Sequence, residues 1–116
     1  MTDQRRPDEH PNGLRVGWTT TATPTEAQTL APLLLGAGAA CVQIDPAIES
    51  HYTWNGVLHR DRETRLWVKY AAIHENALQE VLRQHHPYEC PQWITMTVTT
   101  ALPAYANWIL NSLPKP

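Results

Sequence analysis

The chain has 116 residues, the length of one small domain with a single core. Its formal net charge of −2 argues against a nucleic-acid-binding surface, which would be strongly basic. No stretch approaches the roughly 18 apolar residues of a membrane span, so the composition, 42% hydrophobic, indicates a globular domain that binds no nucleic acid and enters no membrane.

The N-terminal residues are polar and end in Pro11-Asn12-Gly13, which is a turn signal. We therefore expect a disordered arm over residues 1–13. The arm lacks the apolar segment of a secretory signal, so we expect a cytoplasmic protein whose two cysteines, Cys41 and Cys90, are reduced thiols.

Alternating apolar residues predict a first strand over 14–21. The sequence Thr-Pro-Thr-Glu at 23–26 then predicts a helix start with a capping box. Pro32 interrupts the apolar repeat of this helix and predicts a kink or a shift. Gly36 and Gly38 are expected to end it.

Two long strands are expected next. The first runs over 39–54 with a bulge or bend at Pro46, because proline cannot donate to a central ladder. Asn55-Gly56 is a strong hairpin signal, and the chain returns as a strand over 57–71. The alternation there places Leu66, Val68 and Tyr70 on one face and Arg65, Trp67 and Lys69 on the other.

The last third of the chain predicts a helix, a strand and a short helix. The helix spans 73–85 with one apolar face, and the strand covers 93–99. Pro103 opens the last helix. The side chains expected to face inward from the two helices are Ile73, Ala77, Leu78, Val81, Leu82 and His85, and Tyr105, Trp108 and Ile109.

Between the second helix and the fourth strand lies the elbow, residues 85–91, with the sequence His-His-Pro-Tyr-Glu-Cys-Pro. Its two prolines fix the backbone twice, and Pro87 pushes His86 out of helical space. The elbow gathers two imidazoles, a phenol, a carboxyl group and a thiol. We expect a rigid connection between helix and strand, a functional site, or both.

The order strand–helix–strand–strand–helix–strand with a final helix is the split βαβ pattern. It predicts an α+β, ferredoxin-like domain (βαββαβ plus a C-terminal helix), in which helices cover one face of an antiparallel sheet. The other face is expected to carry Trp67, Trp93 and a row of threonines. Such a face is too apolar for water and predicts association with another chain.

Several motifs in this order resemble the CutA divalent-cation tolerance proteins over residues 14–113. The resemblance implies a compact homotrimer, similar to the trimeric PII signalling proteins, with hairpins that reach across subunits. The residues that carry it are Ala39-Ala40-Cys41-Val42-Gln43-Ile44, then Ser50, Tyr52, Trp54 and Gly56, then Glu63 and Lys69, then His86-Pro87-Tyr88-Glu89 with Pro91, and finally Tyr105 and Trp108-Ile109.

The same resemblance implies a non-enzymatic role linked to copper or another divalent cation, with none obligatory and no catalytic residues. Its metal ligands would be His85 and His86, because imidazole suits copper. This chain has Thr19 where some bacterial members carry a cysteine ligand. The alternative for the histidines is a favourable interaction with the dipole at the end of the helix.

Three functions remain open at this point. The first is metal binding or tolerance, and the second is a PII-like signalling or scaffold module that binds a small ligand or a protein at subunit clefts. The third is an enzyme acting through the elbow, which no residue spacing supports.

A disulfide within one subunit is excluded, because the strands near Cys41 and Cys90 should lie three positions apart, about 14 Å.

Overall fold

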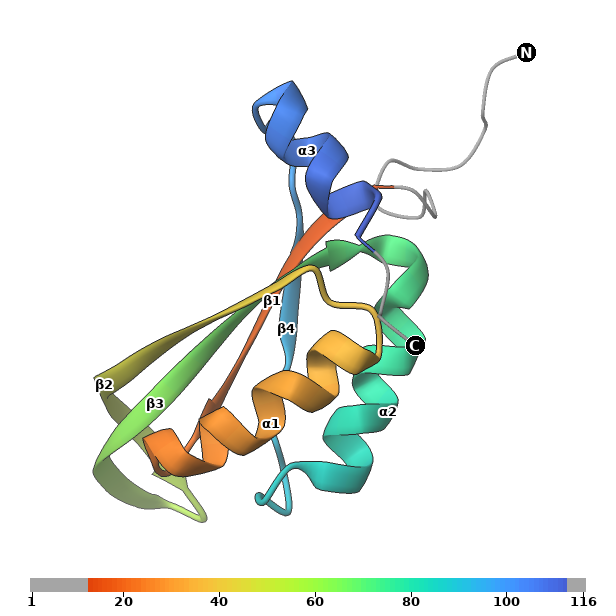
Figure 1. The fold of residues 1–116 in the computed structure, drawn as a ribbon. Coiled ribbons are helices and arrows are strands. Elements are labelled where there is room, and N and C mark those ends of the chain that lie inside the picture. The colour runs from red at the N-terminus through yellow and green to blue at the C-terminus, as the bar shows by residue number, and fades with distance from the viewer. Residues whose placement is uncertain (1–12, 113–116) are drawn as a thin grey trace.

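The structure is a computed structural model that describes residues 13–112 (Figure 1). The predicted disordered arm lies outside these residues, except for Gly13. Among the residues described, no helix is long and apolar enough to cross a membrane. The elements are β1 (Leu14–Thr21), α1 (Pro24–Gly36), β2 (Cys41–Trp54), β3 (Val57–Ala71), a 3-10 turn (Ala72–His74), α2 (Glu75–His85), β4 (Ile94–Thr97) and α3 (Pro103–Leu110).

The strands form one antiparallel sheet in the order β2-β3-β1-β4. The helices α1 and α2 pack on one face of it, and α3 lies near one end of β1 and β3 (Figure 1). The predicted α+β, ferredoxin-like fold is therefore confirmed. The order places β2 and β4 at opposite edges, as the spacing argument for the cysteines required, and both cysteines are free thiols.

The core lies between the sheet and the two helices. Leu66, Val68 and Tyr70 of β3 are fully buried, which confirms the predicted inward face of this strand. Alternation along β3 produces this face because successive side chains of a strand point to opposite sides. The helical residues that meet them are Ala27, Leu30 and Leu34 of α1 and Leu78 and Leu82 of α2.

The capping box predicted for α1 is present. Thr23 Oγ1 accepts a hydrogen bond from the backbone N–H of Glu26, and the Glu26 carboxylate accepts one from the backbone N–H of Thr23. These bonds satisfy two donors that a helix start leaves without partners. The helix continues through Pro32 to Gly36.

The long hairpin of β2 and β3 also follows the prediction. Asn55 and Gly56 both adopt positive φ angles, 51° and 77°, as a tight turn between twisted strands requires. The register between the strands shifts between Asp45 and Ile48, so the bulge lies at Pro46 as expected. The Pro46 carbonyl accepts a hydrogen bond from Thr64 Oγ1 at 3.0 Å, which holds the bulge against β3.

The predicted inward face of the second helix is partly wrong. Leu78 and Leu82 are buried, but Ile73, Ala77 and His85 are exposed. A 3-10 turn over Ala72–His74 precedes the helix, so α2 begins only at Glu75. Ile73 therefore lies before α2 and His85 is its last residue, so the predicted inward face does not hold at either end.

Trp93 does not lie on the open face of the sheet, where it was predicted. Its indole packs against Tyr70 with the ring centroids 6.0 Å apart, and Nε1 donates to the Glu75 carboxylate at 2.7 Å. Both partners belong to the helix-covered side. Strand β4 is also shorter than predicted, and the threonine row predicted for the open face is wrong as well. Thr95 lies on the helix-covered side, where Arg15 donates to its hydroxyl, and Ile94 and Met96 occupy the open face instead.

The inward face predicted for the last helix is correct only for Ile109, which is buried. Tyr105 and Trp108 are 40% and 51% exposed, and their rings stack on each other. Lys69 Nζ on β3 donates to Tyr105 Oη at 3.0 Å. The helix therefore contacts the sheet through few side chains and leaves an aromatic surface open.

We expect Gly17→Ala to destabilise the fold by about 1–3 kcal/mol, because a new methyl group overpacks the core. A Cβ at Gly17 would lie 2.4 Å from the indole of Trp93, which its hydrogen bond to Glu75 holds in place. The matched control is Gly36→Ala, where nothing lies within 4 Å of the added Cβ. Urea unfolding of both variants measures the difference, and equal midpoints would contradict the close packing of Trp93 on β1.

Candidate functional site

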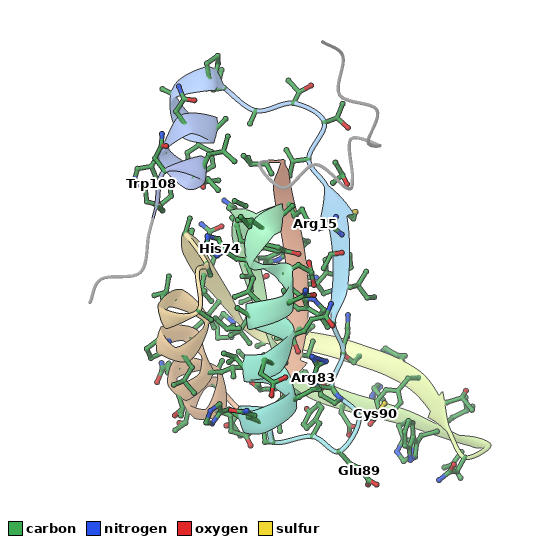
Figure 2. All side chains as sticks on the ribbon, turned by 90° about the vertical axis from the view of Figure 1, so that its right-hand side faces the viewer. Arg15, His74, Arg83, Glu89, Cys90 and Trp108 are labelled. Atoms are coloured by element: carbon green, nitrogen blue, oxygen red, sulfur yellow. The ribbon has the colours of Figure 1, made fainter. Side chains whose placement is uncertain are left out.

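A groove of about 940 Å³ separates the hairpin from the elbow. We call it the hairpin groove. In Figure 2 the segment with Cys90 lies beside the hairpin that projects from the sheet. The residues that line the groove and carry polar or aromatic chemistry are Tyr52, Trp54, His59, Asp61, Arg62 and Glu63 from the hairpin, and Tyr88, Glu89 and Cys90 from the elbow.

His86 anchors the elbow to β1. The residue is only 9% exposed and adopts an extended backbone, which turns its ring away from the end of α2. Its Nδ1 accepts a hydrogen bond from the backbone N–H of Tyr88 at 3.1 Å. The proton of the neutral ring is therefore on Nε2, which donates to the Thr20 carbonyl at 2.9 Å and lies 3.0 Å from Thr19 Oγ1.

The environment favours the neutral form of this ring. Burial lowers the pKa of His86, and the hydrogen bond to Thr20 and the nearby Glu26 and Glu63 oppose the shift only in part. Both ring nitrogens are used within the subunit. As the structure stands, His86 offers no nitrogen to a metal ion.

His85 has a different environment. It is the last residue of α2 and is exposed to solvent, so its imidazole is accessible to a metal ion. The two predicted ligands are therefore adjacent in sequence, with one ring buried and the other in solvent. Within residues 13–112 no three side chains of histidine, cysteine, aspartate or glutamate are grouped so as to hold a metal ion.

Tyr88 links the elbow to the hairpin. Its phenol donates to the Glu63 carboxylate on β3 at 2.7 Å, and its ring lies 5.0 Å from that of His86. Burial and the hydrogen bond to Glu63 raise the pKa of Tyr88, so the phenol keeps its proton. A continuous chain of hydrogen bonds thus runs from Thr20 through His86 and Tyr88 to Glu63.

The hairpin wall of the groove is aromatic and acidic. Tyr52 stacks on His59 with the ring centroids 5.1 Å apart and the planes 13° from parallel. The Tyr52 phenol donates to the Asp61 carboxylate, and this hydrogen bond, followed by desolvation, raises the pKa of Tyr52. The indole of Trp54 is 55% exposed. Stacked rings and the Asp61 carboxylate therefore face the same space.

Tyr88 and Glu89 of the elbow do not meet Lys69 or Arg83 in a common polar site. Glu89 is exposed on the elbow and points away from the body of the subunit (Figure 2). Lys69 donates to Tyr105, and Arg83 donates to Glu80 on its own helix. The partner of Tyr88 is Glu63, which sequence reasoning connected only with the family motif.

The face of the sheet opposite α1 and α2, which we call the bare face, carries an apolar patch. Trp18 and Trp67 are in contact there with the ring centroids 5.1 Å apart, and Ile94 and Met96 are 47% and 50% exposed. At its margin Arg65 pairs with Asp45 at 2.9 Å. The hydrogen bond from Arg65 lowers the pKa of Asp45, and a further hydrogen bond from the Trp67 indole lowers it as well.

Comparison with known proteins gives one consistent result. The chain matches the CutA1 divalent ion tolerance protein family over residues 15–112. It is 36% identical over 88 residues to the divalent-cation tolerance protein CutA of Escherichia coli strain K12 / DH10B, which covers 75% of this chain and 79% of that protein.

Solved structures agree with this match. CutA from Synechococcus elongatus PCC7942 is 37% identical with a TM-score of 0.81, over 87% of this chain and 90% of that chain. CutA1 from Oryza sativa is 31% identical with a TM-score of 0.82, and the match covers 86% of this chain and 93% of that chain. A second structure of the Synechococcus protein is described as complexed with a Bis-Tris molecule. It is 37% identical with a TM-score of 0.78, and the match covers 87% of this chain and 94% of that chain.

Proposed function

The chain belongs to the CutA1 divalent ion tolerance family, and from this membership we propose that it acts as a non-enzymatic, cytoplasmic homotrimer that binds copper or another divalent cation. Divalent-cation tolerance is the function that the family carries. The trimer, the choice of copper and the cytoplasmic location are our proposals. The cation is a ligand of the protein and is not needed for folding.

The observation that supports the trimer is the bare face. Trp18, Trp67, Ile94 and Met96 form a continuous apolar surface on strands that pair with one another. Exposed apolar surfaces of this kind mark contacts between proteins. Three copies that turn this face inward would remove it from water, and a closed ring leaves no such face open.

The metal proposal assigns different roles to the two histidines of the elbow. His85 is the ligand that a cation meets first, because its ring is in solvent. His86 joins the site only after one of its hydrogen bonds to Tyr88 or Thr20 is broken. Imidazole nitrogen suits copper, and the neutral state of His86 favours coordination once a nitrogen is free.

The test is a calorimetric titration of Cu²⁺ into the full chain carrying His10→Ala, because the arm contains a histidine of its own. We expect His85→Ala to weaken the apparent affinity roughly tenfold or more, since an accessible imidazole is lost. The matched control is His51→Ala, which removes another exposed histidine, on the hairpin. Equal affinities with and without His85 would reject the elbow as the metal site.

A second candidate function is favoured by a specific observation, the hairpin groove. We propose that a trimer of this chain binds a small ligand there, as a PII-like signalling or scaffold module would. Register places Glu63 on the same side of β3 as Arg65 and Trp67, so the groove continues the bare face and would become a cleft between subunits. The Synechococcus relative complexed with Bis-Tris supports a small-molecule site in this family.

A further inference from the structure

We propose that the hairpin groove selects an organic ammonium ion, held between the aromatic side chains of the hairpin and the carboxylates beside them. The inference rests on the second proposed function, that the groove binds a small ligand, and adds the chemical class of that ligand. Four properties of the groove support it: its aromatic faces, its charge, the rigidity of one carboxylate, and its size.

The aromatic faces come from β2 and the start of β3. Trp54 is 55% exposed and Tyr52 is 41% exposed, so both rings have surface available to a ligand. Tyr52 is also held by its stacking on His59. The face of an aromatic ring attracts a cation through its quadrupole, and tryptophan does so most strongly. Such faces therefore favour a cation that carries carbon groups around its charge.

The charge of the groove is complementary to the same ligand. The carboxylates of Asp61 and Glu63 line it, against one guanidinium, that of Arg62. Asp61 and Glu63 each accept one phenolic hydrogen bond, from Tyr52 and Tyr88. A carboxylate that accepts one hydrogen bond keeps its negative charge, so each of the two still attracts an organic cation, including one without N–H groups.

The Glu63 carboxylate is also positioned in advance. Tyr88 holds it from the elbow, the backbone of Tyr88 is held by His86, and His86 is held by the Thr20 carbonyl on β1. A group that is fixed before the ligand arrives loses less conformational entropy on binding. The chain of hydrogen bonds thus holds one negative charge of the hairpin at a defined position in the groove.

The size of the groove fits an organic ligand. Its volume of about 940 Å³ lies in the upper part of the range of roughly 300–1,000 Å³ found for small-molecule sites. Stacked rings form one side of this volume and the elbow forms the other, with Cys90 and Pro87 on its lining. A metal ion alone would leave most of this space and all of the aromatic faces unused.

The test uses three probes of similar shape that differ in charge: choline, its neutral isostere 3,3-dimethylbutan-1-ol, and the anion 3,3-dimethylbutanoate. Each is titrated into the full, ¹⁵N-labelled chain, whose five tryptophans give five indole N–H signals. The signal missing in Trp54→Phe identifies the groove. We expect choline to shift that signal with a dissociation constant below about 10 mM. The alcohol should bind at least about tenfold more weakly, and the anion should cause no shift. The reason is that only the cation is attracted by the charge distribution of the ring faces.

Substitutions in the groove distinguish the attraction of the carboxylate charge from the attraction of the aromatic ring face. We expect Glu63→Gln and Trp54→Leu each to weaken choline binding about fivefold or more, because one loses the charge and the other the ring face. Since Trp54→Leu has no Trp54 indole signal, choline binding to this variant is followed by the backbone N–H signal of Glu63. The control is Glu49→Gln, which removes an exposed hairpin carboxylate that does not line the groove, and it should leave binding unchanged.

The outcomes distinguish the inference from the function on which it rests. If the alcohol or the anion shifts the Trp54 signal as strongly as choline, the groove binds small molecules but the ammonium class is wrong. If no probe shifts the signal, the groove is rejected as a ligand site and both proposals fail. If Glu49→Gln weakens choline as much as Glu63→Gln does, the cation responds to the general charge of the hairpin and the proposed site is rejected.

Discussion

Replacing Ile94 with aspartate should convert the proposed trimer into a folded single subunit. Ile94 lies on the bare face, directly opposite Trp18 in the pairing of β4 with β1, and is 47% exposed in one chain. A carboxylate at this position remains hydrated in the isolated subunit. In the trimer it would be buried without a partner, which costs roughly 3 kcal/mol or more for each subunit.

Since 1.4 kcal/mol corresponds to a factor of ten, the three substitutions in one trimer should raise its dissociation constant by roughly six orders of magnitude. Sedimentation velocity measures the assembly, and circular dichroism verifies the fold of the variant. The matched control is Leu35→Asp on α1, 40% exposed but on the helix side of the sheet, which should leave the trimer intact. A wild-type chain that sediments as a stable single subunit would contradict the proposed assembly directly.

The parts of the fold that the sequence predicted well are those whose cause is local. The capping box at Thr23 and Glu26 is formed by groups three residues apart, and the Asn55-Gly56 turn needs only positive φ at two neighbouring positions. The alternation in β3 gave its buried face correctly because residues 65–70 carry the pattern without a break. These signals are sufficient to specify the order of the elements and hence the fold class.

The errors fall on short elements with weak patterns. Strand β4 has four residues and α3 has eight, so neither shows enough periods to identify its inward face. Trp93 was assigned to the open face by counting along the strand. In the structure it precedes β4 and packs into the space that Gly17 leaves open. Only the distant pairing of β1 with β4 determines that contact.

The candidate site could be predicted in its residues but not in its connections. The elbow can be identified from the sequence because it concentrates reactive groups around two prolines. The partners of its side chains lie 66 residues away at Thr20 and 25 residues away at Glu63, so no local spacing reveals them. The groove itself forms between the hairpin and the elbow, two segments that are distant in the sequence.

A second network of distant partners surrounds Glu75 at the start of α2. Its carboxylate accepts hydrogen bonds from the Tyr70 phenol, from Trp93 Nε1 at 2.7 Å and from Gln79 Nε2 at 2.8 Å. Arg15 Nε of β1 lies 3.5 Å away. One half-buried side chain thus joins β1, β3, α2 and the segment before β4. Burial alone would raise the pKa of Glu75, but the hydrogen bonds from Trp93, Tyr70 and Gln79 outweigh it and the pKa is lowered.

We expect Glu75→Ala to destabilise the fold by about 3 kcal/mol, because it leaves the indole of Trp93 and the phenol of Tyr70 without their acceptor. The matched control is Glu80→Ala on the same helix. Glu80 also accepts from a glutamine four residues later, Gln84, but it is exposed, so its loss should cost no more than about 0.5 kcal/mol.

The lowered pKa of Glu75 also predicts that the effect of Glu75→Ala on stability depends on pH. Above the usual pKa of glutamate, 4.5, the carboxylate is charged in both states and its full contribution to stability is present. As the pH falls through the lowered pKa of the folded state this contribution is lost. The difference in unfolding free energy between the wild type and Glu75→Ala, measured with urea, should therefore shrink below about pH 4.5, whereas the difference for Glu80→Ala should stay small throughout. A gap for Glu75→Ala that is independent of pH would assign its cost to packing alone and contradict the charge-dependent role of the carboxylate.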